Sequence, residues 1–267
     1  MLKCQILTSQ MLTLTLPKAT SFAMQLIDDP KLLELTSNLS ISTLAQRCSP
    51  ARAREFLAGR VAAQRALAAL GAQDCRVARL AKAPVWPAGF VGSISHCDGL
   101  AVAICARSQH YLALGIDIQT PIEPGAWAAL QRFALSIDEW ASCTPNPELL
   151  ADLMSRKEAA WKCCAALGFN WPLPSIPAHK PLSNILPNAV LATHRCGGFS
   201  VSIAMLASAI SFLLSLASLS EALTYASTSK IDTTCTTPAS TPDTLARASS
   251  NSEILSNPAL RERPDLS

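Results

Sequence analysis

Three short β-like segments follow one another near the middle of the chain and require a fold that contains an antiparallel sheet. Residues 90–95 and 100–106 are joined through Asp98 and Gly99, a pair that favours the tight turn of a hairpin. A third segment, 111–118, follows after a few more residues. We therefore expect residues 90–95 and 100–106 to form an antiparallel hairpin pair, and 111–118 to be a third strand.

Apolar and polar side chains alternate along the third segment. Its apolar positions share one face: Leu112, Leu114, Ile116 and Ile118. The other face carries Asp117 and Gln119, with Gly115 leaving open space beside Asp117. We therefore expect the first face to enter the core and the second to bring two polar side chains together.

Two helices are predicted, one before and one after these segments. Residues 51–70 are rich in strong helix formers and end at Gly71. The second helix has its N-cap at Asn146, a proline at the first helical position, and a predicted end near Leu167. With the strands between them, these helices indicate a mixed α and β domain.

One face of the second helix carries Ser155, Glu158 and Lys162 at helical spacing. Taken alone, Glu158 and Lys162 are typical of an exposed salt pair. Lys157 points toward the apolar stripe of the helix, which includes Trp161, and a cation in that place needs an anion as partner. The spacing leaves open whether this face is solvated or forms a site.

Composition excludes some classes of function. The 267 residues are 49% hydrophobic, enough for a packed core, and the net charge of +3 is too small and scattered to indicate nucleic-acid binding. Ten cysteines include no Cys-x-x-Cys pair, so we expect no zinc site and no disulfide framework. The absence of a disulfide framework favours a reducing cytoplasm. We also expect a monomeric protein.

Four segments divide the chain in our interpretation. Residues 1–45 are weakly patterned, 46–120 and 121–227 form two α/β halves, and 228–267 is a Ser/Thr/Pro-rich tail that we expect to be disordered. Within the second half, residues 201–219 carry no charge. They are long enough for a membrane span, but buried strands or a core helix are the preferred interpretation, with no membrane attachment.

Three motifs carry the chemistry: residues 92–96 (Gly-Ser-Ile-Ser-His), 115–119 (Gly-Ile-Asp-Ile-Gln) and 155–162 (Ser-Arg-Lys-Glu-Ala-Ala-Trp-Lys). A carboxylate on a strand and another on a helix can converge as oxygen ligands for Mg²⁺, which takes its remaining ligands from water and phosphates. Together the motifs resemble those of the 4′-phosphopantetheinyl transferase superfamily, in the surfactin-type branch, and are similar to its enterobactin-type members. Residues 54–60 and 84–96 share this resemblance.

The resemblance implies an α+β fold made of a pseudo-twofold pair of α/β subdomains. Each subdomain would be a helix packed on a small antiparallel sheet, with coenzyme A bound in a cleft between them. It also implies an enzyme that transfers the 4′-phosphopantetheine group to a serine of an apo acyl or peptidyl carrier protein and releases 3′,5′-ADP. Siderophore, nonribosomal peptide or polyketide synthesis would be the setting.

By the same resemblance, Asp117 and Glu158 hold Mg²⁺ on the pyrophosphate, and Glu158 is also the base for the carrier serine. Coenzyme A would be contacted by residues of both halves: Arg54, Arg60, Ser95, His96, Asp117, Lys157 and Lys162. Of these, Lys157 and Lys162 would bind phosphates, and Lys162 would also stabilise the reaction's developing charge.

Gln119 departs from the family pattern, because many members have an acid at that place. An amide can ligate Mg²⁺ through its oxygen or orient a metal-bound water, but it cannot act as a base. Weaker metal affinity is expected. A catalytically weak binding module for coenzyme A or a carrier protein is therefore the alternative function.

Overall fold

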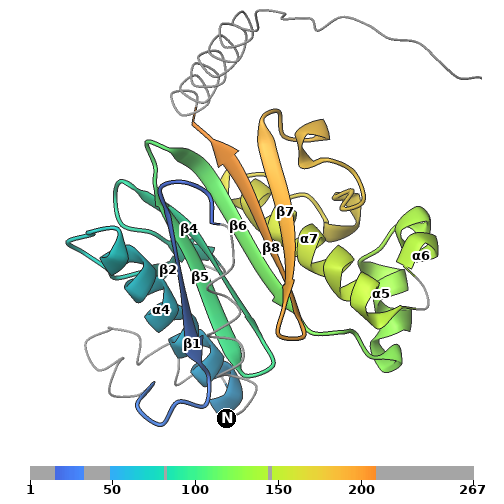
Figure 1. Ribbon diagram of the computed structural model, residues 1–267, viewed down its shortest axis with the longest axis horizontal. Coiled ribbons are helices and arrows are strands. Elements are labelled where there is room, and N and C mark those ends of the chain that lie inside the picture. The colour runs from blue at the N-terminus through green and yellow to red at the C-terminus, as the bar shows by residue number, and fades with distance from the viewer. Residues whose placement is uncertain (1–15, 33–48, 81–82, 144–145, 209–267) are drawn as a thin grey trace, which may run out of the picture. The chain divides into compact units, whose positions relative to one another are not determined.

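A computed structural model of the chain describes residues 16–32, 49–80, 83–143 and 146–208. The described part is an α+β fold in which helices pack on small antiparallel sheets (Figure 1). This confirms the fold class predicted from the sequence at that level of detail.

By its internal contacts the chain divides into two units, Met1–Ala222 and Leu223–Ser267. All described residues belong to the first unit. The predicted tail, 228–267, lies outside the described residues.

The first sheet has the strand order β1-β5-β4 and is covered by one long helix, α4 (Pro50–Ala69). Its strands are β1 (Thr20–Leu26), β4 (Phe90–Cys97) and β5 (Leu100–Arg107). In β5 the side chains of alternate residues are buried on opposite faces, so that one face packs on α4 and the other enters a second core. The strand is therefore buried on both faces.

Strand β1 falls in the N-terminal segment that the sequence assigned to neither half. It pairs antiparallel with β5, from Thr20 opposite Ala106 to Leu26 opposite Leu100. A short strand at a sheet edge gives a weak local signal, because most of what defines it is pairing with a distant partner.

The predicted hairpin is confirmed. Strands β4 and β5 pair antiparallel, and the turn between them places Asp98 and Gly99 at φ values of 46° and 82°. These left-handed conformations are the ones that an Asp-Gly pair accepts in a two-residue hairpin turn. A smaller antiparallel pair, β2 (Ala78–Leu80) with β3 (Ala83–Val85), follows α4.

The second sheet has the order β6-β8-β7 and is covered by α7 (Pro147–Ala166). Its strands are β6 (Tyr111–Gln119), β7 (Ala189–Cys196) and β8 (Phe199–Ala207). The ladder of β6 is with β8, although β6 follows β5 directly in the chain. The strand that carries Asp117 thus belongs to the sheet under α7.

Helix α7 begins as predicted. The Asn146 side chain accepts hydrogen bonds from the backbone N–H groups of Glu148 and Leu149, at 2.9 and 3.0 Å. An asparagine cap followed by proline satisfies or removes the free donors of the first turn. Trp161, predicted on the apolar stripe, is instead 37% exposed.

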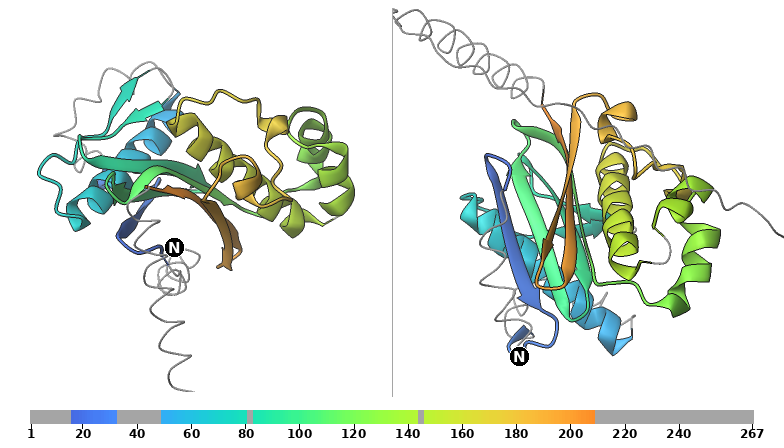
Figure 2. Two further views of the ribbon diagram at one scale, coloured as in Figure 1. Left: turned by 90° about the horizontal axis from the view of Figure 1, so that it is seen from above. Right: turned by 45° about the vertical axis from the view of Figure 1, so that its right-hand side comes forward.

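Shorter elements connect β6 to α7 and α7 to β7. Between β6 and α7 lie a 3-10 turn and two helices: Pro124–Ala126, α5 (Trp127–Phe133) and α6 (Ile137–Cys143). Between α7 and β7 lie the 3-10 turns Leu173–Ser175 and Leu182–Asn184. Figure 2 shows α5 and α6 beside α7, at the side of the second sheet away from α4.

The alternation predicted along β6 is confirmed at three of its four apolar positions. Leu114, Ile116 and Ile118 are buried in a core that also contains apolar side chains of β5 and β8. Leu112 is 52% exposed, because the pairing register with β8 shifts between Tyr111 and Ala113. This irregularity turns Leu112 away from the core.

The uncharged segment 201–219 is in part a strand. Residues 201–207 belong to β8, the central strand of the second sheet, and therefore to the protein core rather than to a membrane-spanning helix. Residues 209–219 lie outside the described residues. Among the helices of the described ranges, none has the length and hydropathy needed to cross a membrane.

The contact between α7 and β6 depends on Gly115. A Cβ atom at this position would overlap the carbonyl oxygen of Ala159 and lie 2.8 Å from the backbone nitrogen of Cys163. Both are atoms of the α7 backbone, which cannot yield as a flexible side chain can. The helix therefore approaches the strand as closely as it does only because residue 115 is glycine.

We expect Gly115→Ala to lower the free energy of unfolding by about 2 kcal/mol or more, because α7 must move off β6. Gly125→Ala is the control, since a Cβ there meets no atom within 4 Å. Chemical denaturation of both variants measures the difference. Equal stability of the two variants would show that α7 does not need this close approach.

Candidate active site

Asp117 lies at the C-terminal end of β6 and is only 1% exposed. Its Oδ1 accepts hydrogen bonds from Ser95 Oγ at 2.6 Å and from Lys162 Nζ at 2.6 Å. Its Oδ2 accepts one from Gln119 Nε2 at 3.0 Å. The carboxylate is thus held by donors from β4, β6 and α7.

Lys162 connects these elements. Besides Asp117, its ammonium group lies 3.0 Å from Ser95 Oγ and 3.0 Å from the backbone oxygen of Ile116. The nearer carboxylate oxygen of Glu158 is 4.0 Å away. The three sequence motifs therefore meet at one place, as their chemistry predicted.

Glu158 is poised between its two protonation states. Burial raises the pKa of its carboxyl group to about 7, with a further increase from the nearby Asp117 carboxylate and an opposing effect of Lys162. Two carboxyl groups this close repel each other when both are charged. A carboxyl group with a pKa near neutrality can accept and release a proton at physiological pH.

Ser155 positions the site without facing it. It is fully buried, and its Oγ lies 3.1 Å from the backbone oxygen of Asp117 and 3.3 Å from that of Ser200. The hydroxyl therefore joins α7 to β6 and β8 beside the carboxylate. Sequence spacing placed Ser155 on the face of Glu158 and Lys162, and the structure explains why a small hydroxyl residue stands there.

Lys157 has a different role from the one predicted. It is completely buried, and its ammonium group donates to Glu139 Oε2 at 2.7 Å, to Ile176 O at 2.6 Å and to Pro174 O at 3.4 Å. These acceptors use its three N–H groups. The expectation that Lys157 contacts a phosphate is therefore wrong. The sequence also predicted that a lysine at this buried position needs an anionic partner, and that partner is Glu139.

Glu139 on α6 is also fully buried. Burial alone would raise the pKa of its carboxyl group, but donors from Lys157 and from the backbone N–H groups of Ser136 and Ala178 hold the pKa below its ordinary value. The ion pair therefore ties α6 and the segment before β7 to α7. Glu139 carried no signal in the sequence, because its partner is a long way along the chain.

His96 lies at the end of β4 beside two side chains of α4. Its Nε2 is 2.7 Å from Arg52 Nη1 and 3.8 Å from a carboxylate oxygen of Glu55. Burial lowers the pKa of His96, Glu55 opposes this, and Arg52 adds to it. The structure thus adds Arg52 to the candidate residues, which sequence reasoning had missed in favour of its neighbour Arg54.

The two predicted arginines are placed differently. Arg54 is exposed and lies 3.6 Å from Asp28. Arg60 is 6% exposed, stacks on the Phe56 ring at 4.5 Å, and has a pKa lowered to about 10 by burial and by the neighbouring Arg79. In the described part of the chain, Arg60 Nε has no hydrogen-bond partner. A buried guanidinium with an unused donor fits an anionic ligand better than Arg54 does.

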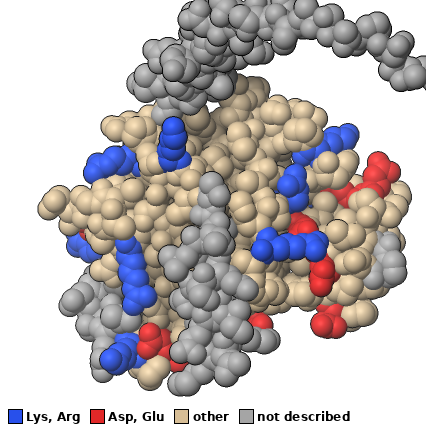
Figure 3. Space-filling view, viewed as in Figure 1, with Lys and Arg blue, Asp and Glu red and all other residues tan. Residues whose placement is uncertain are grey.

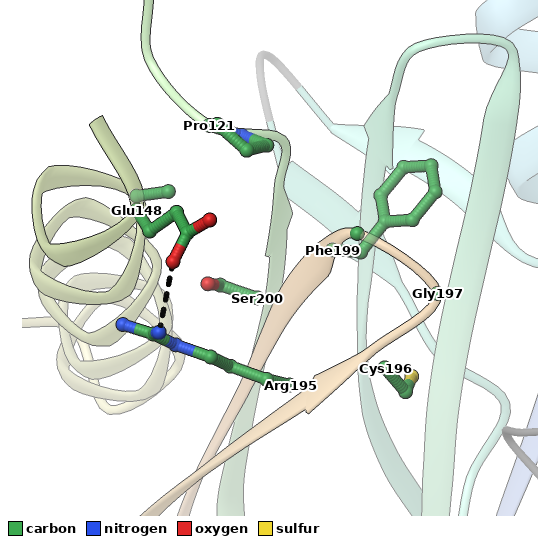
Figure 4. A pocket seen from close by; sticks show the side chains of 9 residues that line it. Pro121, Glu148, Arg195, Cys196, Gly197, Phe199 and Ser200 are labelled. Carbon is green, nitrogen blue, oxygen red and sulfur yellow. Dashed lines mark hydrogen bonds and ion pairs between the residues drawn. The ribbon is translucent and has the colours of Figure 1, made fainter.

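A separate pocket of about 460 Å³ lies between the start of α7 and the β7–β8 hairpin (Figure 4). Arg195 spans it and pairs with Glu148 at 3.3 Å and with Asp152. Its lining contains none of the predicted site residues.

In the face shown in Figure 3, most acidic side chains gather on the side of α5, α6 and α7, whereas Lys and Arg are spread over both sides.

A comparison with known families finds a match in the first part of the chain. Residues 41–106 match the model of the 4′-phosphopantetheinyl transferase N-terminal domain. The resemblance to phosphopantetheinyl transferases is confirmed. This matched region contains α4, β4 and β5, and with them Arg52, Arg60, Ser95 and His96.

Curated relatives point the same way. The chain is 33% identical over 123 residues to 4′-phosphopantetheinyl transferase Npt of Nocardia iowensis, covering 45% of this chain and 55% of that protein. It is 35% identical over 115 residues to enterobactin synthase component D of Salmonella typhimurium, covering 42% and 47% respectively. It is also 35% identical over 123 residues to 4′-phosphopantetheinyl transferase Svp of Streptomyces mobaraensis, covering 43% of this chain and 49% of that protein. The chain thus spans about half the length of the curated relatives it matches.

The buried ion pair gives a test of the role of Lys157. We expect Lys157→Met to lower the free energy of unfolding by about 3–5 kcal/mol, because Glu139 is left as an uncompensated buried charge. The double variant Glu139→Gln with Lys157→Met should recover part of this loss. Lys180→Met, at an exposed position, is the control. Thermal and chemical unfolding measure the effect, and a Lys157→Met protein of normal stability would return Lys157 to a ligand-binding role.

Proposed function

We propose that this protein transfers the 4′-phosphopantetheine group of coenzyme A to a serine of an apo carrier protein and releases 3′,5′-ADP, with Mg²⁺. The observation that carries the proposal is the convergence of Asp117, Glu158 and Lys162 beside Ser95. The match of residues 41–106 to the transferase domain and the names of the relatives support it.

The donor set fits Mg²⁺. The site offers two carboxylates, Asp117 and Glu158. Within the described residues no group of three or more His, Cys, Asp and Glu side chains could hold a metal, so the protein alone would not complete the ligand set. The Gln119 amide and the Ser95 hydroxyl add oxygen atoms. Mg²⁺ prefers such hard oxygen ligands and keeps positions for water and substrate phosphates. A divalent cation would also relieve the repulsion from Asp117, which adds to the effect of burial in raising the pKa of Glu158.

Each residue of the site has a role in this reaction. When bound, Mg²⁺ supplies positive charge to the pyrophosphate of coenzyme A. Glu158, with a pKa near 7, accepts the proton of the carrier serine as its oxygen attacks phosphorus. Lys162 neutralises charge that develops on the phosphoryl oxygens, and the departing 3′,5′-ADP carries the rest.

We assign the nucleotide end of coenzyme A to the first half of the fold. Arg52 and His96 lie together at the end of β4, and Arg60 and Arg79 share the Phe56 ring. Guanidinium groups bind phosphates with two parallel hydrogen bonds. In this proposal the ligand lies in a cleft between the two helix-on-sheet halves, which are related by a pseudo-twofold axis.

The names of the relatives suggest candidate carrier proteins and pathways. Enterobactin synthase component D is named for the enterobactin assembly, which makes a peptidyl or acyl carrier of siderophore synthesis the first candidate substrate. Carriers of nonribosomal peptide or polyketide synthesis are further candidates. A cytoplasmic location and a monomeric state remain predictions from the sequence.

Gln119 favours one alternative, a catalytically weak module that binds coenzyme A or a carrier protein. It replaces an acid found in many family members and donates its N–H to Asp117. Incubation of the protein with coenzyme A, Mg²⁺ and a panel of apo carriers, followed by mass spectrometry, separates the two functions. Coenzyme A binding without a mass increase on any carrier would support the module.

Isosteric variants test the site directly. We expect Asp117→Asn and Glu158→Gln each to reduce the rate of carrier loading by about 100-fold or more, because each removes a negative charge from the metal site or the base. Coenzyme A-dependent loading of a carrier, followed by mass, measures the rate, and circular dichroism confirms folding. Wild-type rates in either variant at ordinary Mg²⁺ would refute the assignment.

Gln119→Glu tests the departure from the family. The amide lies 3.0 Å from Asp117, so a carboxylate there could reach the same ion. We expect the Mg²⁺ concentration for half-maximal activity to fall several-fold, because an acid adds a formal charge to the site. A magnesium titration at saturating coenzyme A measures it. An unchanged or raised requirement would place Gln119 outside the metal shell.

A further inference from the structure

The ammonium group of Lys162 lies where the two candidate metal ligands converge. It is 2.6 Å from Asp117 Oδ1 and 4.0 Å from Glu158 Oε2, and it is the positive charge that balances this pair of carboxyl groups. An ammonium group and a divalent cation bound to the same oxygen repel each other strongly at such distances. Lys162 and a metal ion therefore compete for Asp117.

The other hydrogen bonds of Asp117 also affect the competition between Lys162 and a metal ion. Ser95 Oγ donates to the same oxygen as Lys162, and Gln119 donates to the second oxygen. Within the described residues Asp117 thus accepts three hydrogen bonds, and the Glu158 carboxyl group also lies beside it. A metal ion that binds Oδ1 would have to share that oxygen with two donors, one of which carries a positive charge.

Lys162 is a donor that is able to leave. Its side chain is 21% exposed, whereas Ser95, which donates to the same oxygen, is only 6% exposed. A partly exposed lysine on a flexible stem can turn to another anion. The phosphates of a bound nucleotide would provide such an anion. Lys162 lies 3.0 Å from Ser95 Oγ on β4, and in the proposed function Ser95 contacts this nucleotide.

We propose that Lys162 is an exchangeable internal counter-ion, which holds Asp117 in the metal-free protein and moves to a ligand phosphate when a divalent cation binds. This inference rests on the proposed function for the identity of the ligand as a nucleotide phosphate. Its consequence is that metal and nucleotide bind cooperatively. Metal binding without nucleotide is weak, because the ammonium group then has no second anion to join.

Mn²⁺ titrations followed by electron paramagnetic resonance test the exchange without using activity. In the absence of nucleotide, Lys162→Met should bind Mn²⁺ about tenfold more tightly than the wild type, because the competing charge is gone. Lys162→Gln should do the same while keeping a polar side chain. Lys180→Met removes the same charge at an exposed position and should leave the affinity unchanged.

The second arm repeats the titrations with 3′,5′-ADP. In the wild type the nucleotide should strengthen Mn²⁺ binding several-fold, and in Lys162→Met this enhancement should be reduced. Unchanged or weaker Mn²⁺ binding by both Lys162 variants, or the same gain in Lys180→Met, would overturn the exchange. A wild type that shows the exchange but loads no carrier protein would refute the transferase instead, so the two failures are distinct.

Discussion

The close contact of α7 with β6 is the constraint on which the rest of the site depends. Gly115 lets the backbone of α7 approach β6 closely. Two residues after Gly115 in the strand, the backbone oxygen of Asp117 accepts a hydrogen bond from the buried Ser155 hydroxyl of α7. These two fixed points set both the distance and the rotation of α7. They place Glu158 and Lys162, one and two turns beyond Ser155, opposite the carboxylate of Asp117. The position of the site thus depends on one close backbone contact and on one buried side-chain hydrogen bond.

Two lysines of one motif show how position on a helix decides the role of a charge. Lys157 and Lys162 are five residues apart, and therefore face different sides of α7. Lys157 points into the interior, where it is balanced by Glu139 and two carbonyl groups. Such a pair adds specificity of packing more than stability, since burial offsets its Coulomb energy. Lys162 points toward β4 and β6 and is partly exposed, which leaves it able to change partners.

Local patterns in the sequence predicted most of the candidate site. Alternation along β6 placed Asp117 and Gln119 together, and helical spacing placed Glu158 and Lys162 on one face, as the structure has them. Pairings between distant segments were beyond such patterns. The ladder of β6 with β8, the edge strand β1 and the partner of Lys157 depend on tertiary contacts that no local period reports. Arg52 was missed for a related reason, because several arginines of one helix are equivalent until a neighbour such as His96 is known.

The charge balance of the site gives a reason for an amide at position 119. Asp117 and Glu158 together carry up to two negative charges, and Lys162 supplies one positive charge. Burial raises the pKa of Glu158 to about 7, and the nearby Asp117 carboxylate raises it further. A third acid would deepen the charge imbalance, whereas Gln119 donates a hydrogen bond to Asp117 and adds no charge. The amide therefore leaves this imbalance as it is and holds Asp117 Oδ2, whereas Lys162 holds Oδ1.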